Sequence, residues 1–134
     1  MSDKFSNADL GQEISLFGRY ISCEVQTAKT VTKGDVVEAA AEVSNGLPKV
    51  QPALTGSLIV LGVALESGIA GATIQVAVGG IVKVTAGTGG TTVGKYVMAS
   101  ADAGKITDAD AYGKVFGRAL HTLNSGDTGL VLLD

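Results

Sequence analysis

The chain has 134 residues, enough for one domain with one core, and its formal charge of -3 gives no basic field that could neutralise a nucleic-acid backbone. Hydrophobic residues make up 46% of it and charged residues 17%, a balance that excludes a disordered chain. The longest apolar run, Leu58 to Leu65, is too short for a membrane-spanning helix of about 20 residues. Charged residues interrupt the first twenty positions, so we expect no secretory signal and synthesis in the cytoplasm.

The N-terminal segment differs from the rest of the chain. Residues 1–30 contain Phe5, Phe17 and Tyr20, three of the six aromatic residues. We interpret this range as an arm or entry segment. Near its end, Cys23 falls in an alternating apolar stretch, where a single thiol is expected to behave as a small buried hydrophobe.

Residues 31–134 are predicted to form a single β-rich domain. Short runs of Val, Ile and Thr alternate there with glycine, a pattern typical of strands joined by tight turns. Such strands favour an all-β protein over one with long helices. The candidate strands, including one inside the N-terminal segment, are 20–26, 35–41, 58–65, 73–78, 81–85, 94–99, 114–120 and 128–133.

An internal repeat is the most informative feature of the sequence. Gly62-Val63-Ala64-Leu65 matches Gly117-Arg118-Ala119-Leu120 at an offset of 55 residues, calculated from 117 − 62. Thr32–Val37 similarly matches Thr92–Val97, and Lys49-Val50 matches Lys105-Ile106. The predicted copies span about 31–85 and 90–134. Pairing two half-repeats buries their apolar faces and removes exposed strand edges, which predicts a small barrel or compact sandwich.

One segment has the spacing of a phosphate-binding loop. Residues 89–95 read Gly-Gly-Thr-Thr-Val-Gly-Lys and follow a candidate strand. Tyr96 stands where such a loop needs a Ser or Thr hydroxyl for its metal, and the residues after Lys95 leave little room for crossover helices. A small nucleotide-binding protein that uses Gly89–Lys95 is therefore the weaker alternative.

The polar residues do not assemble into a catalytic or metal-binding motif. His121 has no second histidine or cysteine at ligand spacing, so a surface histidine is the preferred interpretation. Asp102, Asp108 and Asp110 lack the glutamate that completes a calcium loop, and they predict a solvated loop instead. We therefore expect no enzyme, no cofactor, no metal and no small-molecule substrate.

The order of motifs from residue 58 onward resembles that of the phage capsid cement, or head decoration, proteins. The resemblance lies in Gly-Val-Ala-Leu at 62–65, an acidic residue, a glycine turn and a strand-Gly-Gly-strand hairpin that ends at Val84. It implies a β-rich virion protein, often a homotrimer, that binds an assembled shell from outside. The implied partner is the major capsid protein, with no direct contact to nucleic acid or membrane.

Two questions about this role stay open at the level of sequence. Phe5, Leu10 and Phe17 are candidate capsid-contact residues, because an aromatic-bearing arm is suited to reach a neighbouring subunit. The same three side chains are equally suited to cap the core of their own domain. The role itself has an alternative of the same structural class, an accessory protein of the tail or baseplate.

Overall fold

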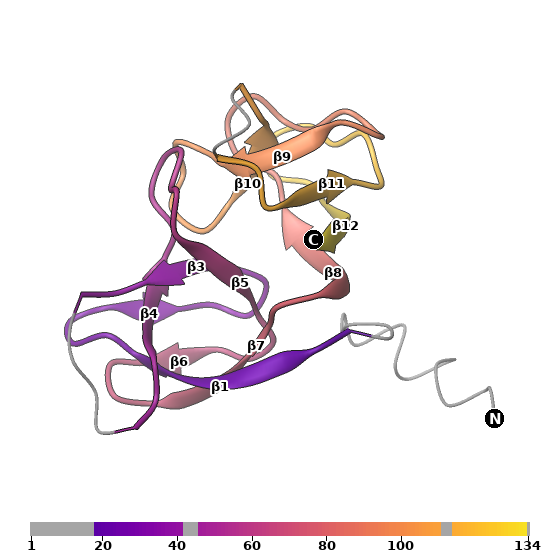
Figure 1. Cartoon of the computed structure of the whole chain (residues 1–134). Helices are drawn as coiled ribbons and strands as arrows, with labels where there is room; N and C mark the ends of the chain where they lie inside the picture. Colours follow the sequence, from indigo (N-terminus) through magenta and orange to yellow (C-terminus); the bar gives the residue numbers. More distant parts are fainter. Residues whose placement is uncertain (1–17, 42–45, 111–113, 134) are drawn as a thin grey trace, which may run out of the picture.

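The computed structural model describes residues 18–41, 46–110 and 114–133, and within these ranges it contains strands, turns and loops but no α-helix (Figure 1). The strands are β1 (Tyr20–Val25), β2 (Thr30–Val31), β3 (Val36–Ala39), β4 (Lys49–Pro52), β5 (Val60–Ala64), β6 (Gly68–Ile69), β7 (Thr73–Ala77), β8 (Gly80–Thr85), β9 (Tyr96–Ala99), β10 (Ile106–Asp108), β11 (Gly117–Ala119) and β12 (Thr128–Leu133).

The predicted all-β class is confirmed, and each of the candidate strands overlaps an observed one. Four further strands, β2, β4, β6 and β10, escaped prediction. They are two to four residues long, and β4 carries Pro52 while β10 carries Asp108. Proline and aspartate are rare in strands, so these elements depend on the strands that they pair with rather than on their own sequence.

The first five-stranded sheet closes into a barrel with the strand order β1-β4-β3-β5-β7. β1 completes it by pairing antiparallel with β7 and parallel with β4. The second sheet has the order β10-β9-β11-β12-β8. A parallel bridge between Ala86, which follows β8, and Ile106 joins its two edges. The chain therefore folds into two successive units, each built on a five-stranded sheet, which we call the first copy and the second copy. In Figure 1 the first copy lies at the lower left and the second at the upper right.

The strand register shows that the two copies share one topology. Val37 lies opposite Gly62 in the first copy, and Val97 lies opposite Gly117 in the second. These pairs are related by the offsets of 60 and 55 residues that the sequence repeat indicates. An offset of 55 relates both strands of the β5–β7 pairing to those of the β11–β12 pairing. Offsets of 60 and 56 relate the β3–β4 pairing to the β9–β10 pairing.

The minor pairings repeat as well. The bridge between Val31 and Gly68 in the sheet of β2 and β6 corresponds to the bridge between Thr91 and Leu123. Ala28 has a left-handed φ of 66°, and its counterpart 61 positions later is Gly89, with φ 98°. The backbone conformation is thus conserved between the copies even where the residue type is not.

The strand pairings divide the chain at a different place from the predicted ranges of 31–85 and 90–134. β8 is the counterpart of β1 at an offset of 61, because Thr85 pairs with Thr128 as Glu24 pairs with Thr73. The first copy therefore contains β1 to β7, and the second contains β8 to β12. β1 lies inside the predicted N-terminal segment 1–30, and it is a barrel strand because it supplies partners for both β4 and β7.

Each copy has an apolar interior, and one of the two interiors extends across the junction. The first cluster fills the barrel of the first copy and includes Cys23, so the expectation of a buried thiol is confirmed. The second cluster fills the second copy and also takes in first-copy residues, namely Val36, Ala53, Val63 and Ala77. Complete burial of a valine stabilises a fold by about 1.5–3 kcal/mol, so these residues hold the copies together.

Candidate interaction surfaces

In the loop with phosphate-binding spacing, the backbone amides of residues 90–95 all donate to acceptors within the protein. The amides of residues 90–95 donate to Gly87 O, Leu123 O, the Asp108 carboxylate, the Thr122 hydroxyl, Ala119 O and Thr92 O. A phosphate cradle needs several such amides directed at one bound anion. The loop is instead a structural turn, the counterpart of the turn at Gly34 in the first copy.

The remaining polar candidates hold the fold together. His121 is exposed, and its Nδ1 accepts a hydrogen bond of 2.9 Å from the Leu130 amide, which confirms a surface histidine beside a strand. Asp102 accepts hydrogen bonds from the amide and hydroxyl of Thr88, and these bonds hold the pKa of its carboxyl below the ordinary range. Asp108 binds Thr92 in the same way. Asp102 and Asp108 therefore each stabilise a separate turn by accepting hydrogen bonds.

Within the described ranges, no three side chains of His, Cys, Asp or Glu are grouped closely enough to hold a metal ion. Those ranges also contain no helix of the length and apolarity that a membrane crossing requires. The remaining candidate sites are exposed surfaces.

The outer face of the second sheet carries a row of large side chains. Tyr96 lies opposite Arg118, Arg118 opposite Leu132, and Leu132 opposite Ile81. Tyr96 is 39% exposed and Leu132 is 41% exposed, while their neighbours Val97 and Val131 point inward. We call Tyr96, Arg118 and Leu132 the outer row. Alternation along a strand explains why bulky residues stand on this side.

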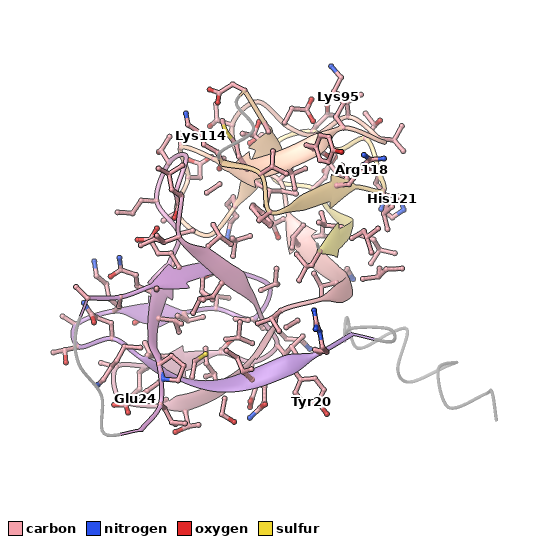
Figure 2. The ribbon with its side chains drawn as sticks, in the orientation of Figure 1. Tyr20, Glu24, Lys95, Lys114, Arg118 and His121 are labelled. Carbon is pink, nitrogen blue, oxygen red and sulfur yellow. The ribbon has the colours of Figure 1, made fainter. Side chains whose placement is uncertain are left out.

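Arg118 is held in place by Tyr96. Its guanidinium lies 4.5 Å from the centroid of the tyrosine ring, and it donates a 2.7 Å hydrogen bond to the phenol oxygen. Among the described residues, Arg118 pairs with no carboxylate, and neither does the adjacent Lys95. Figure 2 shows Lys95 and Arg118 on the side of the second copy that faces away from the first.

A second exposed apolar surface lies on the loop between β4 and β5. Leu54, Leu58 and Ile59 are 56%, 71% and 55% exposed, and we call them the loop patch. The buried Glu38 organises this loop by accepting hydrogen bonds from Gln51 at 2.7 Å and from the Leu54 amide at 3.2 Å. Burial raises the pKa of Glu38, but hydrogen bonds from Gln51, Ser57 and Leu54, together with the charge of Lys29, outweigh it and lower the pKa below 4.5.

The structure brings together residues that sequence reasoning did not single out. The predicted contact residues Phe5, Leu10 and Phe17 lie outside the described residues. The outer row was missed because its members come from three strands far apart in sequence. One signal was available in the sequence. The repeat places Arg118 and Tyr96 of the second copy where the first copy has the aliphatic residues Val63 and Val36.

Comparisons with known proteins agree with this architecture. The head fiber gp8.5 N base of bacteriophage phi29 superposes with a TM-score of 0.68 at 18% identity, covering 87% of this chain and 93% of that one, and thus shares the fold. A search of curated protein sequences finds no match to this chain. The sequence profile of the phage cement proteins matches residues 17–133. Since this match spans most of the chain, the protein belongs to the phage cement protein family and has a structural role associated with the phage capsid.

Proposed function

We propose that this chain is a decoration protein that binds the outside of an assembled phage head and stabilises the lattice of the major capsid protein. The observation that carries the proposal is the family match over residues 17–133. The described surface supports it, because it offers the loop patch and the outer row for protein contacts, while the phosphate-like loop is occupied by internal hydrogen bonds. A role of this kind needs surfaces rather than catalytic groups.

The proposed mechanism is thermodynamic linkage. A protein that binds the assembled lattice but not the separate subunits stabilises the assembled state by its binding free energy. At a free concentration of one hundred times Kd, one site contributes about 2.7 kcal/mol. Many copies on one shell multiply this contribution, which opposes the outward pressure of packaged DNA.

The finer assignments of the proposal concern assembly and the N-terminal segment. We propose a homotrimer, with the part of residues 1–30 that precedes β1 acting as an arm. Phe5, Leu10 and Phe17 are its proposed capsid-contact residues. Replacing all three by serine is expected to weaken shell binding and to leave the melting temperature of the free protein unchanged. A lower melting temperature with undiminished shell binding would instead assign them to the protein's own core.

The decisive experiment uses shells of the same phage that lack this protein. Purified chain is added in increasing amounts, and binding is measured by cosedimentation and shell melting by calorimetry. We expect saturable binding and a rise in the melting temperature of the shell. An absence of binding at concentrations that saturate intact particles would rule out the decoration role. Antibody labelling of complete particles at the tail rather than over the head would support the tail or baseplate alternative.

A further inference from the structure

The internal repeat gives the outer row a counterpart in the first copy. Offsets of 60 and 55 residues relate Tyr96 to Val36, Arg118 to Val63 and Leu132 to Ala77. In the first copy this row is 0–1% exposed, because it packs into the cluster that fills the second copy. The first copy thus uses this face of its sheet to contact the second copy. On the equivalent, open face of the second copy, Tyr96, Arg118 and Leu132 are exposed.

The side chains of the open face suit a contact between separate proteins. The covered row contains two valines and an alanine, as in a permanent core. The open row contains a tyrosine, an arginine and a leucine, and the arginine is pre-ordered over the tyrosine ring. Tyrosine and arginine are enriched in protein interfaces, where they combine apolar contact area with a polar group.

The charges on the open face indicate the chemistry of the partner. At the covered face, Asp35 of the first copy pairs with Lys105 of the second at 3.3 Å. The counterpart of Asp35 at the open face is Lys95, so the sign of the charge is reversed. Arg118 adds a second cation where the covered face has Val63. No carboxylate of the described residues pairs with Lys95 or Arg118. Electrostatic complementarity therefore favours a partner that brings acidic groups to this face.

The same charges disfavour a second copy of this chain as the occupant. A neighbouring chain that repeated the internal contact would bring Lys49, the counterpart of Lys105, against Lys95. Lys49 is already paired with Glu24 at 2.7 Å. The contact would therefore lose its ion pair and bring two cations together, a repulsive arrangement that blocks propagation from chain to chain.

We infer that Tyr96, Arg118 and Leu132, together with Lys95, form a docking face for an acidic and partly apolar surface of another protein of the phage particle. The inference relies on the proposed function to locate that partner in the phage particle. It predicts that the second copy makes the contact, and that the contact depends on charge and weakens as the salt concentration rises.

The test compares charge reversal at the docking face with the same reversal elsewhere. Arg118→Glu is measured beside Lys33→Glu, which changes an exposed lysine of the first copy by the same charge. Binding to shells and to complete particles lacking the protein is measured at low and high salt. We expect Arg118→Glu to bind at least about tenfold more weakly, with Lys33→Glu unchanged. Arg118→Lys is expected to lie between, because it keeps the charge but loses the planar contact with Tyr96.

The other outcomes separate this inference from the proposed function. If the unmodified chain binds shells and Arg118→Glu binds them equally well, the docking face is wrong and the decoration role stands. If the unmodified chain binds only the tail and Arg118→Glu abolishes that binding, the docking face stands and the decoration role fails. Binding to no part of the particle overturns both. An oligomer in sedimentation velocity that Arg118→Glu dissociates would make a second copy the occupant and overturn the acidic foreign partner.

Discussion

Asp35 of the first copy and Lys105 of the second copy form an ion pair, with Lys105 Nζ 3.3 Å from Asp35 Oδ1. Asp35 is buried, and its other carboxylate oxygen accepts a 2.9 Å hydrogen bond from the Thr32 amide. One side chain thus closes a turn of the first copy and contacts the second. Lys105 is partly exposed, so water screens the pair from its side.

Replacing Asp35 is expected to cost more stability than replacing Lys105. Asp35→Ala removes both the partner of the Thr32 amide and the ion pair, a loss of about 1–3 kcal/mol. Lys105→Ala leaves the hydrogen bond to Thr32 in place and is expected to cost less than about 1 kcal/mol. Urea denaturation of both variants checks the order. Equal losses would mean that the ion pair, and not the turn, dominates the contribution of Asp35.

Gly104→Ala is expected to destabilise the junction between the copies. Gly104 has a φ of +77°, and a Cβ there would lie 2.7 Å from the carboxyl carbon of Asp35, which its hydrogen bonds hold in place. The expected loss is about 2 kcal/mol or more. The matched control is Gly126→Ala, with a φ of +93° and no atom within 4 Å of the added Cβ. The control bears only the backbone cost of about 1 kcal/mol, and equal melting temperatures would contradict the close contact.

Gly62→Ala and Gly117→Ala are expected to prevent folding or to destabilise it by more than about 3 kcal/mol. A Cβ at Gly62 would overlap the carbonyl oxygen of Ala77, and one at Gly117 would lie 2.6 Å from that of Leu132. Backbone atoms of a paired strand have no room to retreat. Circular dichroism and urea denaturation measure the effect, with Gly71→Ala, whose surroundings are open, as the control. A mild effect at one position alone would show that the copies differ in strand spacing.

Glu38 makes the stability of the fold depend on pH in the acid range. Its folded pKa lies below the ordinary value of 4.5, so it stabilises the fold above that pH, and the contribution is lost as pH falls through the folded pKa. Glu38→Gln is expected to cost about 1 kcal/mol near neutral pH and to reduce the slope of stability against pH in the acid range. Asp102 acts in the same direction, so part of the slope is expected to remain. Urea midpoints at stepwise lower pH test this, and an unchanged slope would contradict the role of Glu38.

Cys23 is expected to report on the opening of the first barrel. It is fully buried, and burial raises the pKa of its thiol above 9.0, so little reactive thiolate is present. Alkylation by iodoacetamide in native buffer should be at least about a hundredfold slower than in denaturant. Mass spectrometry gives the rate. Rapid labelling of a protein that keeps its circular dichroism spectrum would show that the barrel opens locally.

The all-β class and the repeat were predictable because they depend on local chemistry. Short Val- and Ile-rich runs between glycines specify strands and turns, and Gly62 and Gly117 recur because each lies where two backbones approach closely. The match between β1 and β8 was not predictable. Tyr20–Val25 and the run from Ile81 to Ala86 share only alternating burial, which many different side chains satisfy.

Sequence by itself determined that this protein would be built from short strands in two related halves, since glycine turns and alternating apolar residues act within a few neighbours. Only the tertiary structure decided that Val36, Val63 and Ala77 are covered while Tyr96, Arg118 and Leu132 are open. Both sets occupy equivalent strand positions, so the local pattern is the same. The difference arises from the packing of the second copy on one face of the first, a contact between residues far apart in the chain.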